Sequence, residues 1–457
     1  MKKLSSLYLA AVLILVSAGS LCAADLKING EYRVRGYSYS SVTGQDYGVG
    51  DSADYIDQRF LLTGTVTQGM TKGVVELDLN GGPNNGGTAW GTSYGTNLTG
   101  SLHQAYLDVT LSPMASLMAG RRMVKLGHGI ILNDTADNLA LTFPLQVVSL
   151  DLAYLKIKDP DSVNNPNSPL NDTDNSAYMA NLNFKPADNE GFSLFYITDT
   201  QKEPGSQDND TKNVFGVTFD GNVGPVAALI EYDNIGGTHS ANGVADTNYK
   251  GQNLLIAVHG NVGVAEVGIG YLRVTGASAG STDTSSNSIS GDFVGGHGIL
   301  LTDQNRYYGG VNLDGRVADA NYGSPNPPGS PQGPNPALNN NFHALKLFAE
   351  TMPTPDMNVG LEYFPLIKLV DGAILQQAIQ QNFGPTFDTN ADTNIGQEIN
   401  LYGTYRLDKN LSVSGVIAYF MTSDVIKDLA EANAALELTT GSNKNVTKLN
   451  AALTYTF

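Results

Sequence analysis

The last eleven residues, Thr447-Lys448-Leu449-Asn450-Ala451-Ala452-Leu453-Thr454-Tyr455-Thr456-Phe457, alternate between two kinds of side chain. Every second residue from Leu449 to Phe457 is apolar, whereas the residues between them, apart from Ala452, are polar. Successive side chains of an extended strand point to opposite faces, so this period of two predicts a β-strand with one apolar and one polar face.

A terminal strand of this kind, ending Tyr455-Thr456-Phe457, resembles the C-terminal signal of bacterial outer-membrane β-barrel proteins. The resemblance implies that Leu453, Tyr455 and Phe457 face lipid and form an assembly signal read by the outer-membrane insertion machinery. Asn450 stands where the family pattern often has glycine. The alternative interpretation is an ordinary edge strand in a soluble sandwich.

The other end of the chain favours export. Lys2 and Lys3 precede an apolar run from Leu7 to Val16 and a small-residue stretch that ends at Ala24. This pattern is typical of a secretory signal peptide over residues 1–24 and is too short to span a bilayer. A lipoprotein signal at Cys22 is less favoured, because Leu21 is large for that pattern.

The first residues after the signal peptide alternate as well. Leu26, Ile28, Tyr32 and Val34 share one face, whereas Lys27, Arg33 and Arg35 share the other with Asn29 and Glu31. A soluble core would not accept three cations on its inner face, but a water-filled lumen would. We therefore expect the first and last strands to pair and close a barrel over residues 25–457, which leaves no free edge.

Composition narrows the class further. Removing the signal peptide removes the single cysteine, which excludes disulfides and thiolate chemistry, and we expect no cofactor. The net charge of −18 becomes −20 without Lys2 and Lys3, which argues against nucleic acid as a partner. There is no internal run of eighteen apolar residues, as a transmembrane helix requires.

Alternating segments recur along the chain, and their connections are short and long in turn. The pattern predicts an all-β, transmembrane antiparallel β-barrel with short periplasmic turns and long extracellular loops. Seventeen strands can be placed directly, but two of them, residues 115–125 and 146–158, would run in the same direction. An unrecognised strand near residues 129–139 resolves this conflict. We therefore expect about 18 strands, with 16 as the alternative.

Three segments do not fit the strand pattern. Residues 276–341 hold a Pro/Gly-rich tract that cannot form a ladder, so we expect a long loop that is external or folded into the lumen. Helical spacing of apolar residues predicts short extracellular helices over Asp371–Phe383 and Val425–Leu438.

One eight-residue motif occurs nearly twice, as Gly127-His128-Gly129-Ile130-Ile131-Leu132-Asn133-Asp134 and as Gly296-His297-Gly298-Ile299-Leu300-Leu301-Thr302-Asp303. The simpler interpretation is a pair of similar apolar turns. The alternative is that both segments lie beyond the regular strands and fold into the lumen, with His128, Asp134, His297 and Asp303 at a constriction. The signal for a metal site is weak and we assign none. No catalytic motif is present, so we do not expect an enzyme.

The stretch Ser116-Leu117-Met118-Ala119-Gly120-Arg121-Arg122, followed by Gly127-His128-Gly129, resembles part of the alginate-export-type porins. The resemblance implies an 18-stranded barrel in which Arg121 lines the pore. Alternation alone allows either Arg121 or Arg122 to do so. Arg122 and His128 depart from the family pattern, so the substrate does not carry over.

The predicted inward faces separate by charge. The basic side comprises Lys27, Arg33, Arg35, Arg59, Arg121 and Lys125, and the acidic side comprises Glu231, Asp233, Glu266, Glu350 and Glu362. These expectations describe a porin in outer-membrane lipid, either monomer or trimer, which passes small hydrophilic solutes by passive diffusion with a weak preference for cations. Alternatives are an anionic polysaccharide exporter, a structural sheath for a periplasmic electron carrier, and an adhesin.

Overall fold

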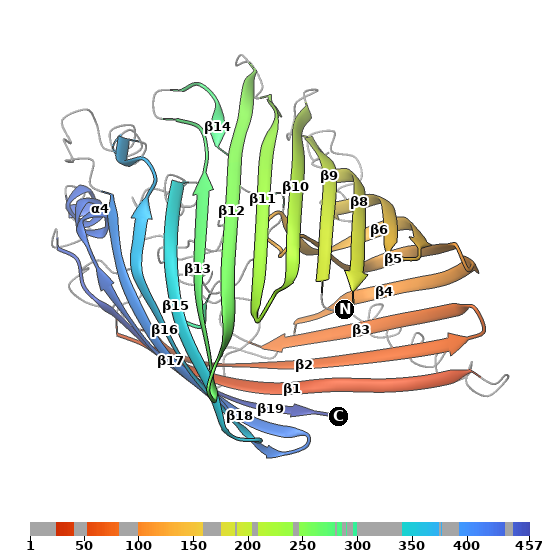
Figure 1. Ribbon diagram of the computed structural model, residues 1–457, viewed down its shortest axis with the longest axis horizontal. Helices are drawn as coiled ribbons and strands as arrows, with labels where there is room; N and C mark the ends of the chain where they lie inside the picture. The colour runs from red at the N-terminus through yellow and green to blue at the C-terminus, as the bar shows by residue number, and fades with distance from the viewer. Residues whose placement is uncertain are drawn as a thin grey trace.

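The first and last strands lie side by side, as the red and blue ends of the chain in Figure 1 show. The structure is a computed structural model, and it describes residues 24–40, 53–81, 99–158, 175–187, 190–202, 209–240, 246–278, 281–285, 289, 296–298, 341–373, 376, 393–434 and 442–457. β1 (Asp25–Tyr39) runs antiparallel to β19 (Val446–Thr456), with Tyr32 opposite Tyr455 and Val34 opposite Leu453. This pairing closes the sheet.

Each strand between these two pairs antiparallel with the next in sequence. In order, they are β2 (Ala53–Gln68), β3 (Thr71–Gly81), β4 (Thr99–Ser112), β5 (Ala115–Leu126), β6 (Leu132–Leu145), β7 (Val148–Lys158), β8 (Asn175–Ala187), β9 (Glu190–Lys202), β10 (Asn209–Val223), β11 (Val226–His239), β12 (Thr247–Val262), β13 (Ala265–Thr275), β15 (Asn341–Thr354), β16 (Met357–Leu369), β17 (Asn394–Asp408) and β18 (Leu411–Thr422). The two-residue β14 (Thr284–Ser285) pairs parallel with β12 and is no part of the wall. Within the described residues the wall therefore has eighteen strands, as predicted.

The strand that we inferred from the directions of its two neighbours is β6, which pairs with β5 and β7. It begins at Leu132 and ends at Leu145, later than the predicted 129–139. Residues 146–147 form the following turn, in which Gln146 has a positive φ of 59°. β7 therefore begins at Val148, two residues later than expected.

The predicted helix at residue 425 is α4 (Asp424–Ala434), whose Val425 and Ile426 are fully buried. Residues 435–438 lie outside the described residues, as does most of the helix expected over 371–383. Residues 1–23 and most of the 276–341 loop are outside them too. Among the described residues, no helix is long and apolar enough to cross a membrane.

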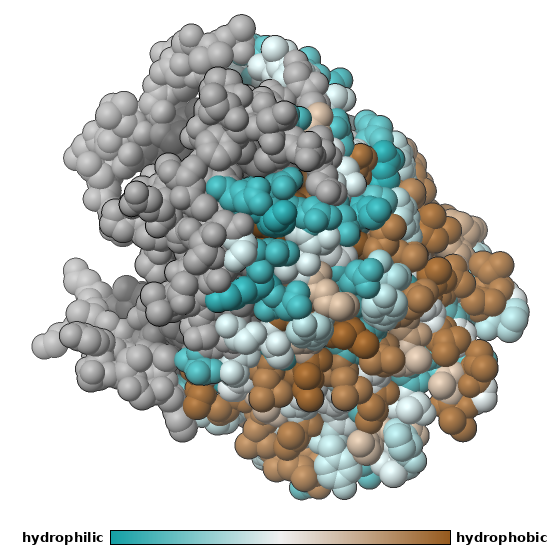
Figure 2. Space-filling model, turned by 90° about the vertical axis from the view of Figure 1, so that its left-hand side faces the viewer, coloured by the Kyte–Doolittle hydropathy of each residue, from teal (hydrophilic) through white to brown (hydrophobic). Residues whose placement is uncertain are grey.

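The outer face of the wall is apolar. On β8 and β9 the outward side chains include Tyr178, Leu182, Leu194 and Tyr196, all more than a third exposed. Figure 2 shows hydrophobic residues (brown) over the lower part of the visible outer face and hydrophilic residues (teal) above them. Large apolar side chains are costly in water, so this face is suited to lipid.

Two pairs of aromatic rings lie near the two limits of this apolar belt on neighbouring strands. Tyr154 contacts Tyr178 at 5.4 Å between ring centroids near one end, and Phe184 contacts Phe192 at 6.2 Å near the other. Tyr178 and Phe184 are six positions apart on β8, or about 20 Å at the usual rise per residue. This separation is close to the roughly 25 Å belt of transmembrane barrels.

Candidate functional site

The first copy of the repeated motif lies inside the barrel and is bound to the inner face of β11. The loop between β5 and β6 places the backbone N–H of His128 2.6 Å from Oε2 of Glu231 on β11, to which it donates. Nδ1 of the same histidine lies 2.7 Å from that oxygen. Gly127 has a φ of 57°, and a Cβ there would strike the Glu231 carboxylate, so a side chain would prevent this approach.

The second copy makes the same kind of contact. The backbone N–H of His297 donates to Oε2 of Glu362 on β16 at 2.9 Å, and Nδ1 lies 3.1 Å from Oε1. The imidazole stacks on Tyr402, with 3.8 Å between centroids and 14° between planes. Lys346 Nζ also donates to Glu362, at 3.3 Å. The two copies of the motif therefore share a partner type and a binding geometry, and we name these contacts the His128 and His297 clasps.

The end of the second motif copy is held from β19. Lys448, which is only 1% exposed, donates from Nζ to the carbonyl oxygen of Gly298 at 2.6 Å. Asn400 on β17 donates to Glu362 at 3.3 Å. Sequence reasoning did not single out Lys448, Lys346, Tyr402 or Asn400. The signal for Lys448 was its place on the polar face of the closing strand.

The aspartate of the first motif copy is a strand residue rather than a member of the clasp. Asp134 is on β6, where it accepts a hydrogen bond from the backbone N–H of Thr135 at 2.7 Å. This placement corrects the expectation that the whole first copy lies beyond the regular strands. Asp303 lies outside the described residues.

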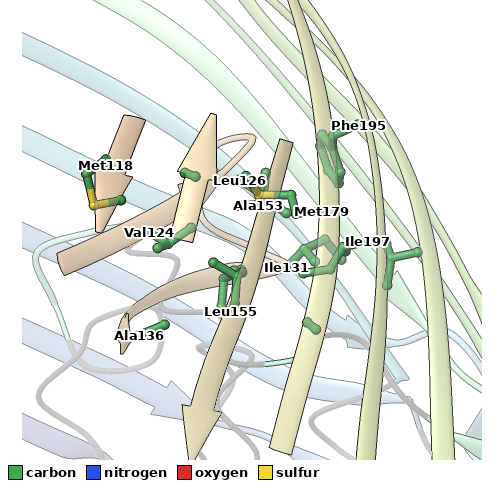
Figure 3. Close-up of a cluster of buried hydrophobic side chains, with 14 of the residues drawn as sticks. Met118, Val124, Leu126, Ile131, Ala136, Ala153, Leu155, Met179, Phe195 and Ile197 are labelled. Atoms are coloured by element: carbon green, nitrogen blue, oxygen red, sulfur yellow. The ribbon is translucent and has the colours of Figure 1, made fainter. Parts of the chain in front are cut away.

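Beneath the His128 clasp, the inner wall is apolar rather than polar. Figure 3 shows part of this cluster, with side chains from β5 to β9 gathered around Ile131 of the loop. The cluster comprises Met118, Val124, Leu126, Ile131, Leu132, Ala136, Ala140, Ala153, Leu155, Ala177, Met179, Phe195, Ile197, Val214 and Ile235. Burial of these side chains stabilises the loop against the wall, in addition to the clasp. This side of the lumen is therefore filled.

Beside the His128 clasp, a second carboxylate is buried. Asp233 shares the inner face of β11 with Glu231, and both residues are 0% exposed. Asn253 on β12 donates to Oδ2 of Asp233 at 3.2 Å. Two carboxyl groups two positions apart in a buried site cannot both ionise without strong repulsion, so the pair is costly to bury.

The predicted basic side is divided between inner and outer faces. Arg33 and Arg35 lie inward on β1, with side chains that are partly exposed. Arg59 on β2 binds Asp78 with two nitrogens, at 3.1 and 2.8 Å, so its charge is largely matched. Lys27 lies near the short-turn end of β1, 3.8 Å from Asp25.

Arg121 and Lys125 do not belong to the inner face. On β5 they share a face with Met123, which is 40% exposed, whereas Arg122 shares the opposite face with the buried Val124. Arg121 donates to Asp137 at 3.3 Å on the outer side. The register therefore corrects the expectation for Arg121 and Lys125, and Arg122 takes the inward position.

The predicted acidic side faces inward, but most of it is already bound. Glu231 and Glu362 hold the clasps, and Glu350 accepts hydrogen bonds from Asn358 and Tyr402, both at 2.8 Å. Glu266 also has a partner, His259 at 2.7 Å, but its side chain stays about two-fifths exposed.

Exposure differs around the lumen. Inner side chains of β6 to β9 such as Leu155, Ala177 and Ile197 are 0% exposed, and so is Asn400 on β17. The side chains of Arg33 and Arg59 are 26% and 27% exposed. Charged side chains of the lumen are therefore accessible along β1 and β2, and also at Glu266 on β13. Among the described residues, no group of three or more His, Cys, Asp or Glu side chains could hold a metal ion.

No family model and no curated protein matches the sequence. Solved structures do match. A BenF-like porin from Pseudomonas fluorescens Pf-5 is 11% identical with a TM-score of 0.53, and the match covers 95% of this chain and 98% of that one. OccK5 (OpdH) from Pseudomonas aeruginosa is 14% identical with a TM-score of 0.52 and the same coverage. The outer-membrane protein OpdK from the same organism is 10% identical with a TM-score of 0.53, over 94% and 98% of the two chains.

These structures give no support to the resemblance to alginate-export-type porins, which rested on the stretch around Arg121. The agreement over nearly the whole length of both chains concerns the course of the backbone, because identity is low. The chain has the closed, eighteen-stranded antiparallel barrel fold that these Pseudomonas porins have.

Proposed function

We propose that this protein is an outer-membrane porin that passes small hydrophilic solutes by passive diffusion. The observation that carries the proposal is a closed strand ladder whose outer face is apolar and whose inner face keeps charged side chains accessible along β1 and β2. A closed ladder satisfies every backbone group in lipid, and an accessible polar inner face supports a column of water.

The two clasped segments set the width of this channel. The His128 clasp holds one loop across the inner faces of β5 to β11, and the His297 clasp holds another against β16 to β19. Loops folded into a barrel narrow it, so the solute cut-off depends on these two segments rather than on barrel diameter. The constriction that we assign is therefore centred on His128 and His297.

The closing strand supports a second part of the proposal. Leu453, Tyr455 and Phe457 all face outward and are more than two-fifths exposed. An apolar, aromatic edge of this kind is accessible before β1 pairs with β19. We assign to these three residues the recognition by the outer-membrane insertion machinery.

Recording from purified protein in planar bilayers tests the porin function. We expect discrete open-channel steps, together with swelling of protein-loaded liposomes in small sugars and none in large oligosaccharides. Pure, folded protein without steps and without swelling would overturn the proposal and favour a sheath or an adhesin. The proposal assigns no catalytic step to the chain.

A further inference from the structure

Three basic residues form a row across the outside of the wall. Arg273 on β13 lies opposite His343 on β15, and His343 lies opposite Lys368 on β16. Adjacent strands are about 4.8 Å apart, so the row spans about 10 Å. It lies where these strands meet the long connections 276–340 and 370–393, and so at the rim with the long loops.

The row faces away from the lumen. The neighbours in sequence, Leu272, Ala344 and Leu369, are at most 6% exposed and belong to the inner face. Because side chains alternate along a strand, Arg273, His343 and Lys368 point outward.

An apolar belt begins directly below the row. Two positions further into the belt are Tyr271 on β13 and Leu345 on β15, and the next outward residues are Ile269 and Leu347, both more than two-fifths exposed. The Tyr271 hydroxyl lies 3.3 Å from Nδ1 of His343. The cations are therefore at the boundary between lipid chains and polar headgroups.

This row differs from the other outward cations in its surroundings. Arg121 on β5 has Asp137 at 3.3 Å, and Lys156 on β7 lies opposite the same aspartate. Within the described part of the chain, no carboxylate pairs with Arg273 or Lys368. Arg273 and Lys368 lie on either side of His343 and carry like charges, so together they attract an anion from outside the wall.

We propose that Arg273, His343 and Lys368 bind the phosphate groups of a phosphorylated glycolipid in the outer leaflet, with its acyl chains against Ile269, Leu345 and Leu347. The long-loop rim places the row in the extracellular leaflet, if the barrel has the membrane orientation of the proposed porin. Charge complementarity supplies the headgroup contact, and the apolar belt supplies the chain contact.

Native mass spectrometry of the purified, folded protein tests this site with four probes: diphosphoryl lipid A, its dephosphorylated form, phosphatidylglycerol and inorganic phosphate. We expect diphosphoryl lipid A to bind the wild type. Arg273→Gln combined with Lys368→Gln should weaken this binding about 25-fold, or about fivefold for each cation removed. The charge-preserving pair Arg273→Lys and Lys368→Arg should keep most of it.

The matched control is Arg121→Gln with Lys156→Gln, which also removes two outward cations but from beside Asp137. It should bind lipid A as the wild type does. Heat-modifiable migration on gels verifies that each variant is folded, and channel conductance, which depends on the lumen, separates failure of this site from failure of the porin function.

Three results would overturn the proposal. The first is wild-type affinity in the Arg273→Gln, Lys368→Gln protein. The second is equally tight binding of dephosphorylated lipid A or of phosphatidylglycerol, which would remove the glycolipid phosphates as the determinant. The third is displacement of lipid A by inorganic phosphate at equal concentration, which would indicate a site for the free anion.

Discussion

At the level of single residues, two buried glutamates hold the segments that narrow the lumen. Glu231 and Glu362 each accept a backbone N–H and contact the ring Nδ1 of one histidine. Hydrogen bonds to an ionised carboxylate are stronger than neutral ones, and removing one partner from a buried site is costly. Each clasp therefore depends on the charge of one side chain.

Replacing Glu231 or Glu362 with Gln should release the corresponding segment. Loss of a charge-assisted contact costs about 1.5–3 kcal/mol, which raises the population of the released segment by one to two orders of magnitude. We expect a larger and noisier single-channel conductance from either variant. Glu266→Gln is the control, because Glu266 pairs with His259 on an adjacent strand and holds no loop. An equal effect of all three substitutions would show that the clasps do not set the conductance.

The buried pair on β11 makes a different prediction. Asp233 places a second carboxyl group beside Glu231, and both side chains are fully buried. Asp233→Asn should therefore stabilise the barrel, by on the order of 1–3 kcal/mol, because an amide removes the cost of burying two neighbouring carboxyl groups. The temperature at which the folded gel band is lost measures this change. Asp78→Asn should have the opposite effect, because it removes the partner of Arg59. A lower transition temperature for Asp233→Asn would mean that its charge is needed.

At the level of strands, the alternation of side chains was sufficient to predict the barrel. Period-two patterns located seventeen strands. The directions of two of these strands required a further strand between them, which is β6. Alternation reports only that two faces differ, however, so it could not show that the inner face of β5 to β9 is apolar. Leu155, Ala177 and Ile197 point inward by alternation and are buried in one cluster with Ile131 of the β5–β6 loop, and no local pattern encodes that contact.

The candidate site was predictable in part. The repeated Gly-His-Gly drew attention to the two segments, but their partners, Glu231 and Glu362, are 103 and 65 residues away in sequence. Arg121 was assigned by resemblance where alternation allowed two answers. Only the register with β4 and β6, which places Arg121 between Ala105 and Asp137, separates it from Arg122.

The seam between β1 and β19 gives a prediction at this level. The Phe457 ring lies over Gly30, whose N–H donates to the Phe457 carbonyl at 2.9 Å. A Cβ at Gly30 would meet both this ring and the backbone oxygen of Leu61, at 2.8 Å, and the backbone cannot move aside.

Gly30→Ala should therefore lower the amount of folded barrel, at a cost of about 1–3 kcal/mol from overpacking. Gly36→Ala is the control, since a Cβ at that position of the same strand has nothing within 4 Å. Deleting Phe457 should have an effect at least as large as Gly30→Ala, measured as heat-modifiable protein in outer-membrane fractions. Equal levels of the Gly30 and Gly36 variants would contradict this account of the seam.

For the whole molecule, burial changes the balance of charge that the lumen presents to water. Sequence alone suggested a basic wall facing an acidic wall, with a weak preference for cations. Glu231, Asp233 and Glu362 are at most 1% exposed, whereas the Arg33 side chain is 26% exposed. These three acids lie at the clasps and present little charge to the lumen, so the accessible acids that remain opposite the arginines are fewer than sequence suggested, with Glu266 on β13 the clearest.

Arg33→Ala combined with Arg35→Ala should accordingly shift the reversal potential in a salt gradient towards cation selectivity. Fields in water are screened within about 10 Å at 0.1 M salt and about 3 Å at 1 M, so the shift should be clear at low salt and small at high salt. Lys27→Ala is the control on the same strand. Its side chain is 69% exposed near the short-turn end and 3.8 Å from Asp25, so it should act more weakly. If the double substitution shifts the potential no further than Lys27→Ala does, solutes do not pass along β1. The accessible path would then lie on another part of the wall.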